Sequence, residues 1–209
     1  MTRDPESLPE KLFLLAVDAR QERLRGGLEL GYALRAAALA DLLLRGHLRD
    51  ESGKACVAKP ASGLDPLLQG VWEEVERAGR CSWRRLINRG RGQAIRATRD
   101  ALAGAGVIRV GKRRVLGLFP ATKITLRGSV HRLADEVGRA IRGGGPVARI
   151  DPDVAALAVL ASAIPLRTVI SVGERRRFKK RRAALGEPIE PIPDALRRVI
   201  ANARAVASG

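Results

Sequence analysis

Two stretches of the chain are apolar on almost every side of a helix. In residues 28–48 (LELGYALRAAALADLLLRGHL), Leu30, Leu34 and Leu42 share one face, and further alanines and leucines fill most of the remaining circumference. A helix that is apolar all round is a buried helix, and its alanines let neighbouring helices approach closely. We therefore predict that residues 28–48 form the central helix of a bundle. Residues 151–164 (DPDVAALAVLASAI) predict a second buried helix that packs against it.

One residue fits the central helix badly. Arg35 is the only charged residue between Glu29 and Asp41, and a guanidinium cannot be buried without a partner. Two interpretations are open. Either Arg35 pairs with an acid, such as Asp41 or Glu29, or it reaches the bundle surface and faces an anionic ligand.

The remaining pattern predicts further helices joined by short loops. Ser7-Leu8-Pro9-Glu10 is a capping box ahead of an apolar run, so a first helix is expected over residues 8–17. Serine, aspartate, proline and glycine signals mark the other boundaries. The further segments predicted in this way are a loop over 18–27, a β-like stretch over 55–59, and helices over 66–75, 83–88, 93–103, 130–142 and 195–206.

Residues 107–119 predict a β-hairpin. Its strands are expected at 107–110 and 115–119, its turn at Gly111–Arg114, and Pro120 is expected to end the second strand. The second strand, VLGLF, is apolar on both faces. If another element covers it, these residues are ordinary core. If the hairpin projects from the protein, they can enter the interfacial region of a bilayer.

Composition indicates the class of fold. The chain has 209 residues, enough for one substantial core, and nothing demands a second domain. Hydrophobic residues make up 45% but aromatic residues only 3%, so leucine, valine, isoleucine and alanine must build the core, which favours helices packed on helices. We predict a mostly α, single-domain helical bundle over residues 1–209, with surrounding amphipathic helices, one β-hairpin and a flexible N-terminus at residues 1–6.

Charge indicates the class of partner. The formal net charge is +17, from 39 basic and 22 acidic side chains. Such a surface attracts polyanions: nucleic acid, an anionic membrane face or an acidic partner. Residues 173–186 are the most charge-biased tract, and we expect this basic segment to be helical or disordered.

The sequence also suggests a compartment. Its start, MTRDPESLPEK, lacks the basic and apolar regions of a signal peptide, and the apolar run Val154–Ile164 is shorter than the ~18–20 residues that span a bilayer. Cys56 and Cys81 form neither a disulfide framework nor a CxxC motif. We expect a cytoplasmic protein with reduced thiols, either soluble or peripheral on the cytosolic face of a membrane.

Catalytic patterns are scarce. His47 and His131 are the only histidines, and neither lies at metal-ligand spacing from a cysteine or the other histidine. The sequence has no GxSxG, HExxH or paired-carboxylate pattern, and its glycine clusters lack the spacing that cradles phosphates. We expect no enzymatic activity, no metal site and no cofactor.

Basic residues gather instead ahead of the predicted hairpin, whose turn carries Lys112, Arg113 and Arg114. Guanidinium groups bind phosphates through paired hydrogen bonds as well as charge. Two binding functions are therefore open, namely anionic lipid and nucleic acid. The nucleic-acid alternative rests on residues 82–119, where two helices and a basic hairpin follow in the order of a winged helix. The basic residues of this cluster are Arg89, Arg91, Arg96 and Arg99.

An ordered set of segments points to one family. The segments are LPE followed by LFLLAVD, then LRAAALADLLLRGHL, LDPLL, AGVIRVGKRRVLGLFPATKITL and DPDVAALAVLASAI. In this order and spacing, over about Leu8 to Leu166, the chain resembles the Golgi phosphoprotein 3 family, which includes the yeast vacuolar-sorting homologue and many bacterial members. The resemblance implies a single, mostly helical domain with amphipathic helices around a bundle and a β-hairpin.

The resemblance also implies a function. Eukaryotic members of the family bind phosphatidylinositol 4-phosphate on a basic, flat face, insert the apolar strand of the hairpin into the membrane, and hold the cytosolic tails of Golgi glycosyltransferases. The implied partners are an anionic phospholipid membrane, with a phosphoinositide as headgroup, and cytosolic tails of membrane proteins. The sequence leaves open whether the chain forms homo-oligomers. The leading hypothesis is thus a peripheral-membrane adaptor, and the alternative is a nucleic-acid-binding protein.

Individual residues follow from the same resemblance. The family's lipid-binding arginine in the central helix corresponds to Arg35, which favours the ligand interpretation of that residue. The family's second arginine pair falls on Gly92 and Ile95, so that neighbouring arginines are the nearest substitutes. The implied headgroup-binding residues are Arg35, Arg91, Arg96 and Arg99, and the implied membrane-inserting residues of the hairpin are Val115, Leu116, Leu118 and Phe119.

Overall fold

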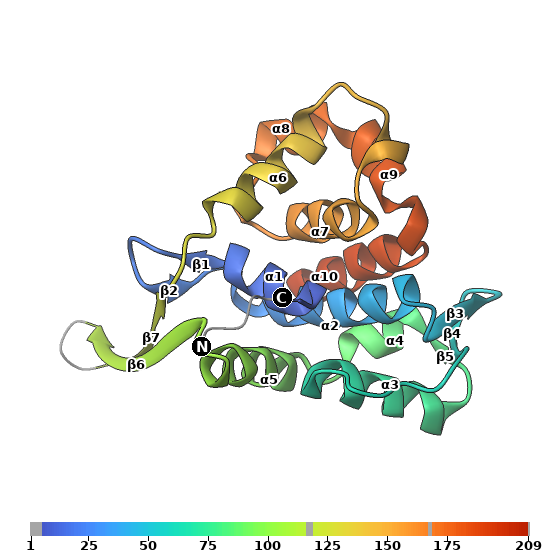
Figure 1. Ribbon diagram of the computed structural model, residues 1–209, viewed down its shortest axis with the longest axis horizontal. Helices are drawn as coiled ribbons and strands as arrows, with labels where there is room; N and C mark the ends of the chain where they lie inside the picture. The colour runs from blue at the N-terminus through green and yellow to red at the C-terminus, as the bar shows by residue number, and fades with distance from the viewer. Residues whose placement is uncertain (1–5, 116–118, 167–168, 209) are drawn as a thin grey trace.

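The fold is a bundle of helices with three small sheets, and a computed structural model describes it for residues 6–115, 119–166 and 169–208 (Figure 1). About 62% of the chain is helical, which confirms the predicted mostly α class. The helices are α1 (Leu8–Leu15), α2 (Gly27–Leu44), α3 (Pro66–Ala78), α4 (Trp83–Asn88), α5 (Arg91–Gly104), α6 (His131–Arg142), α7 (Pro152–Ala163), α8 (Val172–Arg177), α9 (Lys179–Gly186) and α10 (Ile192–Ser208). The strands are β1 (Val17–Asp18), β2 (Arg23–Leu24), β3 (Leu48–Glu51), β4 (Lys54–Val57), β5 (Cys81–Ser82), β6 (Ile108–Val115) and β7 (Phe119–Leu126).

Helix α2 is the central element, as its sequence predicts. Every residue from Leu30 to Leu42 is buried, and the helix contacts α1, α3, α4, α5, α7 and α10. In Figure 1, α3 and α5 lie on one side of α2, whereas α7 and the group α6, α8 and α9 lie on the other. The layers on both sides therefore share α2 as their common support.

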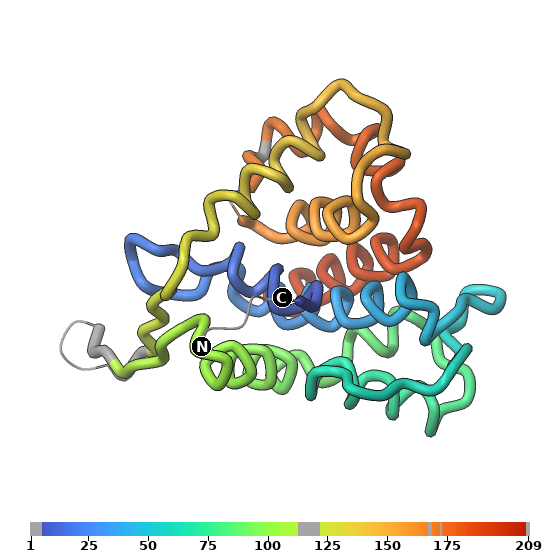
Figure 2. The backbone as a smooth tube through the Cα atoms, viewed as in Figure 1, coloured from blue at the N-terminus to red at the C-terminus, as the bar shows by residue number. Residues whose placement is uncertain are grey.

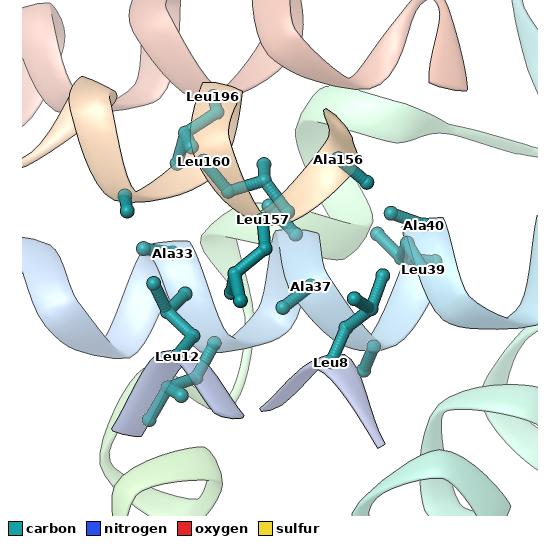
Figure 3. Close-up of a cluster of buried hydrophobic side chains, with 14 of the residues drawn as sticks. Leu8, Leu12, Ala33, Ala37, Leu39, Ala40, Ala156, Leu157, Leu160 and Leu196 are labelled. Atoms are coloured by element: carbon teal, nitrogen blue, oxygen red, sulfur yellow. The ribbon is translucent and has the colours of Figure 1, made fainter. Parts of the chain in front are cut away.

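The predicted packing of the second apolar helix on α2 is confirmed. Leu157 of α7 lies over Ala33 and Ala37 of α2, and Leu8 and Leu12 of α1 lie on the opposite side of the same cluster (Figure 3). All five side chains are at most 1% exposed. The alanines of α2 have no bulk beyond Cβ, so the leucines of its neighbours fill the space between the helices.

Helix α1 is fixed at its start by two carboxylates. Its predicted capping box is present, with Ser7 and Glu10 exchanging side-chain and backbone hydrogen bonds. The backbone N–H of Leu8 also donates to Oδ2 of Asp41 on α2 at 2.7 Å. Burial raises the pKa of Asp41 even though Arg45, its ion-pair partner, opposes that shift. Asp41 thus caps α1 and pairs with Arg45, not with Arg35.

Helix α2 ends earlier than predicted. It stops at Leu44 rather than at Leu48, because Gly46 adopts a left-handed backbone (φ +69°) and the N–H of His47 turns back to the carbonyl of Leu42. Leu48 instead begins β3, which pairs with β4. Helix α1 also ends earlier than predicted, at Leu15 rather than at Val17. Val17 instead begins β1, which pairs with β2 across the predicted loop.

The hairpin lies at the predicted place, but its predicted register was wrong. The run Gly111–Arg114, predicted as the turn, lies inside β6, where Gly111 pairs with Lys123 and Arg114 pairs with Pro120. Pro120 is near the start of the second strand instead of ending it. The strands end at Val115 and begin again at Phe119, so the hairpin is longer than predicted and Val115–Phe119 is not its second strand.

Within the part of the chain that the structure describes, none of the helices combines the length and the apolar character needed to cross a membrane.

Candidate functional site

Arg35 is a buried arginine with bonds to two other helices. Its side chain is 6% exposed, and Nη2 lies 2.5 Å from Oε2 of Glu74 on α3. Nε and Nη2 also donate to the carbonyl of Leu86 on α4, at 3.0 and 2.8 Å. Of the two interpretations of Arg35, pairing with an acid therefore holds, but the acid is Glu74 and neither Asp41 nor Glu29. Removing Arg35 would leave the carbonyl of Leu86 without its donor and Glu74 with only the longer contact to Arg89, at 3.5 Å.

The guanidinium of Arg35 nevertheless lines a pocket. This pocket, of about 420 Å³, lies between α3 and α5 and is lined by polar side chains that include Arg77, Arg89 and Gln93. Arg89 approaches the same carboxylate as Arg35, with Nη1 at 3.5 Å from Oε1 of Glu74. Three arginines thus face two glutamates here, Glu73 being the second, so the pocket carries a small positive excess that an anion can neutralise.

The turn between α4 and α5 positions these groups. Ser82 caps α4, and Gly90 takes a left-handed conformation (φ +62°) that lets α5 begin at once. Helix α5 then approaches α2 closely at Gly31, where a Cβ atom would lie only 2.6 Å from the carbonyl oxygen of Arg91. A side chain at Gly31 would therefore push α5 away from α2, and with it the mouth of the pocket.

Arg91 lies on the other side of this turn. Its Nη1 donates to the hydroxyl of Tyr32 at 2.5 Å, and its guanidinium carbon lies 5.4 Å from the centre of the same ring. Arg91 lines a different hollow, between α2, α4 and α10, and not the pocket at Arg35. The structure therefore does not bring Arg91 and Arg35 into one pocket.

Arg96 and Arg99 lie along the outer side of α5. The buried residues of this helix are Ala94, Thr98 and Leu102, so the face opposite them points away from the bundle. Gln93, Arg96 and Arg99 follow one another at intervals of three, which makes them neighbours along one strip of the helix surface. We call these three residues the α5 strip. It begins at the mouth of the Arg35 pocket, which Gln93 lines, and runs toward the hairpin.

The two arginines of the strip differ in their bonds. Nε of Arg99 donates to Asp100 at 2.8 Å, which lowers the pKa of that exposed carboxyl. Arg96 is exposed and has no ion pair or side-chain hydrogen bond with any residue that the structure describes. The strip therefore carries one arginine bonded directly to Asp100 and one, Arg96, that acts on this carboxylate only through its charge and keeps its hydrogen-bond donors for an anion.

The β6–β7 ribbon leaves the body beyond the far end of α5 (Figures 1 and 2). Its root packs on α5 and on β2, where Glu22 accepts a hydrogen bond from Thr125 and pairs with Lys123 at 2.7 Å. Ile108 and Ile124 are buried there, but the strands then continue outward past these contacts.

Two of the four predicted membrane-inserting residues have a described backbone, at the outer end of this ribbon. Val115 and Phe119 pair as the last described residues of the two strands. Leu116 and Leu118 lie outside the described residues, and so do the side chains of Val115 and Phe119. The assignment of these four residues to membrane insertion therefore stays a prediction.

Sequence reasoning missed several residues of this region. Glu74 lies 39 positions from Arg35, and nothing in the local pattern of either helix indicates that they meet. Tyr32 could not be connected to Arg91 for the same reason. A better signal was available for the α5 strip, because the spacing of three residues between Gln93, Arg96 and Arg99 is visible in the sequence.

A search of the described residues finds no group of three or more histidine, cysteine, aspartate or glutamate side chains with metal-binding geometry. Cys56 and Cys81 are both buried, and burial together with a hydrogen bond to Glu51 raises the pKa of the Cys56 thiol.

Comparison with models of known protein families identifies a family for this chain. The model of the Golgi phosphoprotein 3 (GPP34) family matches residues 8–203, which is nearly the whole chain. No curated protein matches the chain significantly.

Proposed function

The chain belongs to the Golgi phosphoprotein 3 family, and from this we propose that it is a peripheral membrane protein that binds anionic phospholipid headgroups. The observation that carries the proposal is the α5 strip, which connects the arginine-lined pocket at Arg35 with the root of the projecting ribbon. A pocket for a headgroup, charge for a membrane surface and a projecting hairpin thus meet along one helix. Phosphoinositides, and phosphatidylinositol 4-phosphate among them, are the headgroups that we propose it prefers.

Electrostatic attraction supplies the first part of the proposed binding. The formal net charge of +17 draws the protein toward any anionic surface. Each basic residue close to such a membrane contributes about 1 kcal/mol, so Arg96 and Arg99 together account for about 2 kcal/mol. This contribution falls off within a Debye length, so only residues on the face toward the membrane take part.

Apolar insertion supplies the second part. In the sequence, Val115 and Phe119, which pair where β6 ends and β7 begins, are joined by Leu116, Gly117 and Leu118, and we propose that this apolar segment inserts. Burial of apolar surface contributes about 25 cal/mol per Å², so insertion of even part of this segment adds to the electrostatic term.

Arg35 has a different role in the proposal from that of the strip. Its guanidinium already bonds Glu74 and the carbonyl of Leu86, so it holds α3 and α4 against α2 and shapes the pocket floor. A phosphate that enters the pocket meets Arg89 and Arg77 at the wall, and it reaches Arg35 only in competition with Glu74. We therefore propose that Arg35 contributes to headgroup binding mainly by building the site.

The adaptor role of the family extends this proposal. A protein held on the cytosolic face of a membrane is within reach of the cytosolic tails of membrane proteins. We propose that tails of this kind are cargo, and we expect their binding to be detectable only when the membrane component is also present.

Vesicle flotation tests the proposal. Wild-type protein is mixed with neutral phosphatidylcholine vesicles, with vesicles that also contain phosphatidylserine, and with vesicles in which phosphatidylinositol 4-phosphate replaces phosphatidylserine at equal charge. We expect no recovery with the neutral vesicles and recovery with both anionic kinds, higher with the phosphoinositide. Equal recovery from neutral and anionic vesicles would contradict the proposal.

A matched pair of variants locates the binding face. Arg96→Ala/Arg99→Ala removes two charges from the α5 strip and should weaken vesicle binding about 30-fold, the equivalent of about 2 kcal/mol. The control, Arg132→Ala/Arg149→Ala, removes two charges from exposed positions on α6 and at Val147–Arg149. Equal losses in the two variants would show that net charge alone drives binding, and the strip would then have no special role.

A further inference from the structure

A second hollow lies on the molecule outside the proposed lipid site. It is an open groove of about 700 Å³ between α2, α4 and the second half of α10. One wall is apolar: Leu28 of α2 and Val206 of α10 line it, and they are 54% and 85% exposed. Among the described residues, only Val110 joins them as an exposed large hydrophobic side chain. The groove therefore gathers apolar surface that the fold itself does not cover.

The opposite wall of the groove is basic. Arg84 and Arg85 of α4 are exposed, and neither makes an ion pair or a side-chain hydrogen bond with any described residue. Arg91 closes the same wall from the start of α5. The nearby acid, Glu29, is already paired with Arg204 at 2.6 Å, and no acidic residue lines the groove. The positive charge of this wall is thus not compensated within the described part of the protein.

The two walls together identify the occupant. We propose that this groove binds an amphipathic helix of a partner protein, with an apolar face against α10 and α2 and acidic side chains against α4. The α10 residues that line the groove are Val199, Ala203 and Val206, at i, i+4 and i+7. Val199 is only 3% exposed, so Ala203 and Val206 are the positions against which a docked helix places its own anchors. The three lining positions span about 10 Å, or two turns of helix.

The openness of the groove favours a helix over a single lipid chain. Small-molecule sites bury most of their ligand, whereas this groove is partly open to solvent, so a fatty chain in it would stay partly in contact with water. An amphipathic helix needs cover on one face only and keeps its other face in water. The charged wall then selects an acidic helix over a basic one, because opposite charges meet across the interface.

Fluorescence anisotropy with labelled peptides tests this inference on the full chain. The probe is a helical peptide of about 18 residues, with leucines at i, i+3, i+4 and i+7 and glutamates beside them. A second peptide has lysine in place of each glutamate, and a third has the composition of the first with its leucines scattered around the helix. We expect saturable binding of the first peptide and at least about tenfold weaker binding of the other two.

Two variants assign the binding to the groove. Leu28→Ser/Val206→Ser removes the exposed apolar anchors without changing charge, and Arg84→Glu/Arg85→Glu reverses the basic wall. Because all four side chains are exposed, both variants should keep the thermal stability of the wild type, measured by circular dichroism. Each should bind the acidic amphipathic peptide at least about tenfold more weakly, and the second should gain affinity for the lysine peptide.

Several outcomes would overturn the inference. Equal binding of the acidic amphipathic and the scattered peptides would show that net charge alone drives peptide binding. Unchanged peptide affinity in Leu28→Ser/Val206→Ser would show that the peptide binds elsewhere on the protein. Displacement of the peptide by monomeric lysophosphatidic acid, but not by lysophosphatidylcholine, would show that the groove binds a lipid. Vesicle flotation of Leu28→Ser/Val206→Ser should equal that of the wild type, so failure of the peptide test is distinguishable from failure of the proposed lipid binding.

Discussion

Two regions of the molecule are rich in arginine and use it in opposite ways. In α8 and α9, Arg181 donates to the carbonyls of Ala140 and Gly145, and Arg182 donates to the hydroxyl of Ser162 and to a backbone carbonyl. In α4 and α5, by contrast, Arg84, Arg85 and Arg96 have no ion pair or side-chain hydrogen bond with the described residues. The first group fastens α9 to α6 and α7, and the second is available to an external anion.

The difference shows that charge density alone does not identify a binding surface. In the sequence, residues 173–186 are the most basic tract, yet part of their charge serves the fold. An arginine next to helix ends that expose carbonyl oxygens satisfies those oxygens, because each helix leaves its last carbonyls without intrahelical partners. An arginine on the outer strip of a helix meets no such acceptor and keeps its donors for a ligand.

Substitution of Arg35 should give the largest effect in this comparison, because Arg35 lies beside α4 and α5 but forms internal hydrogen bonds like those of the arginines of α9. Arg35→Ala would leave Glu74 without its closest partner and the carbonyl of Leu86 without its donor. We expect the free energy of unfolding to fall by about 3–5 kcal/mol, measured by urea denaturation. A loss below about 1 kcal/mol together with strongly reduced vesicle binding would instead make Arg35 a direct ligand residue.

Arg182 tests the other region. Its pKa is lowered by burial, and its guanidinium bonds Ser162 at 2.7 Å. Arg182→Ala should lower the free energy of unfolding by about 1.5–3 kcal/mol, since hydrogen bonds to a charged group are lost. Lys180→Ala, an exposed neighbour, is the matched control and should change stability by less than about 0.5 kcal/mol. If both variants weakened vesicle binding equally and neither changed stability, α9 would belong to the binding surface.

Salt distinguishes the two regions in a single protein. Raising potassium chloride from about 0.1 M to about 1 M shortens the Debye length from about 10 Å to about 3 Å. Vesicle recovery should fall markedly, because Arg96 is exposed and Arg99 is partly exposed. The thermal unfolding midpoint should change little, because the hydrogen bonds of α9 act at short range. Recovery that is insensitive to salt would mean that insertion dominates and that the strip contributes little.

Lowering the pH should produce the smallest effect on stability, and this effect should arise at Glu174 on α8. The Arg142 guanidinium, helped by Ser171, lowers the pKa of Glu174 to about 2. Since this folded-state pKa lies below the usual value of 4.5, the stabilisation is full above about pH 4.5 and is lost as the pH falls toward 2. The unfolding midpoint should therefore drop between about pH 4.5 and pH 2, and less so in Glu174→Gln.

The exposed Glu76 supplies the control for this measurement. Glu76→Gln removes a carboxylate from α3 without touching α8. Its unfolding midpoint should show the same dependence on pH as that of the wild type. If Glu76→Gln and Glu174→Gln flattened the pH dependence equally, the effect would come from net charge and not from the pair of Glu174 with Arg142.

The buried part of the fold could be predicted because it depends on local pattern. The apolar circumference of α2 and of α7 fixed both helices and their contact, and the capping box fixed the start of α1. The hairpin was harder. Its strands stand partly in solvent, so Lys112, Arg113 and Arg114 can lie in a strand, although the same residues next to Gly111 resemble a turn.

The candidate site was only partly predictable. Spacing along a helix identifies Arg96 and Arg99 as neighbours, because helical periodicity is a local property. Whether Arg35 faces a ligand or an acid depends on Glu74, which is brought to it by the packing of α3 on α2. The same holds for Tyr32 and Arg91, whose contact requires the close approach of α5 at Gly31. Long-range packing decides which arginines remain available, and one sequence does not show it.

The most direct test of the membrane proposal is a fluorophore at the end of the ribbon. An NBD group is attached to a cysteine introduced at Phe119, while the native Cys56 and Cys81, only 5% and 6% exposed, stay unlabelled. With phosphatidylinositol 4-phosphate vesicles we predict a blue shift and a rise in emission, absent with neutral vesicles and absent when the label is moved to Arg149. Protein that floats with the vesicles while the label at position 119 remains in water would contradict the account.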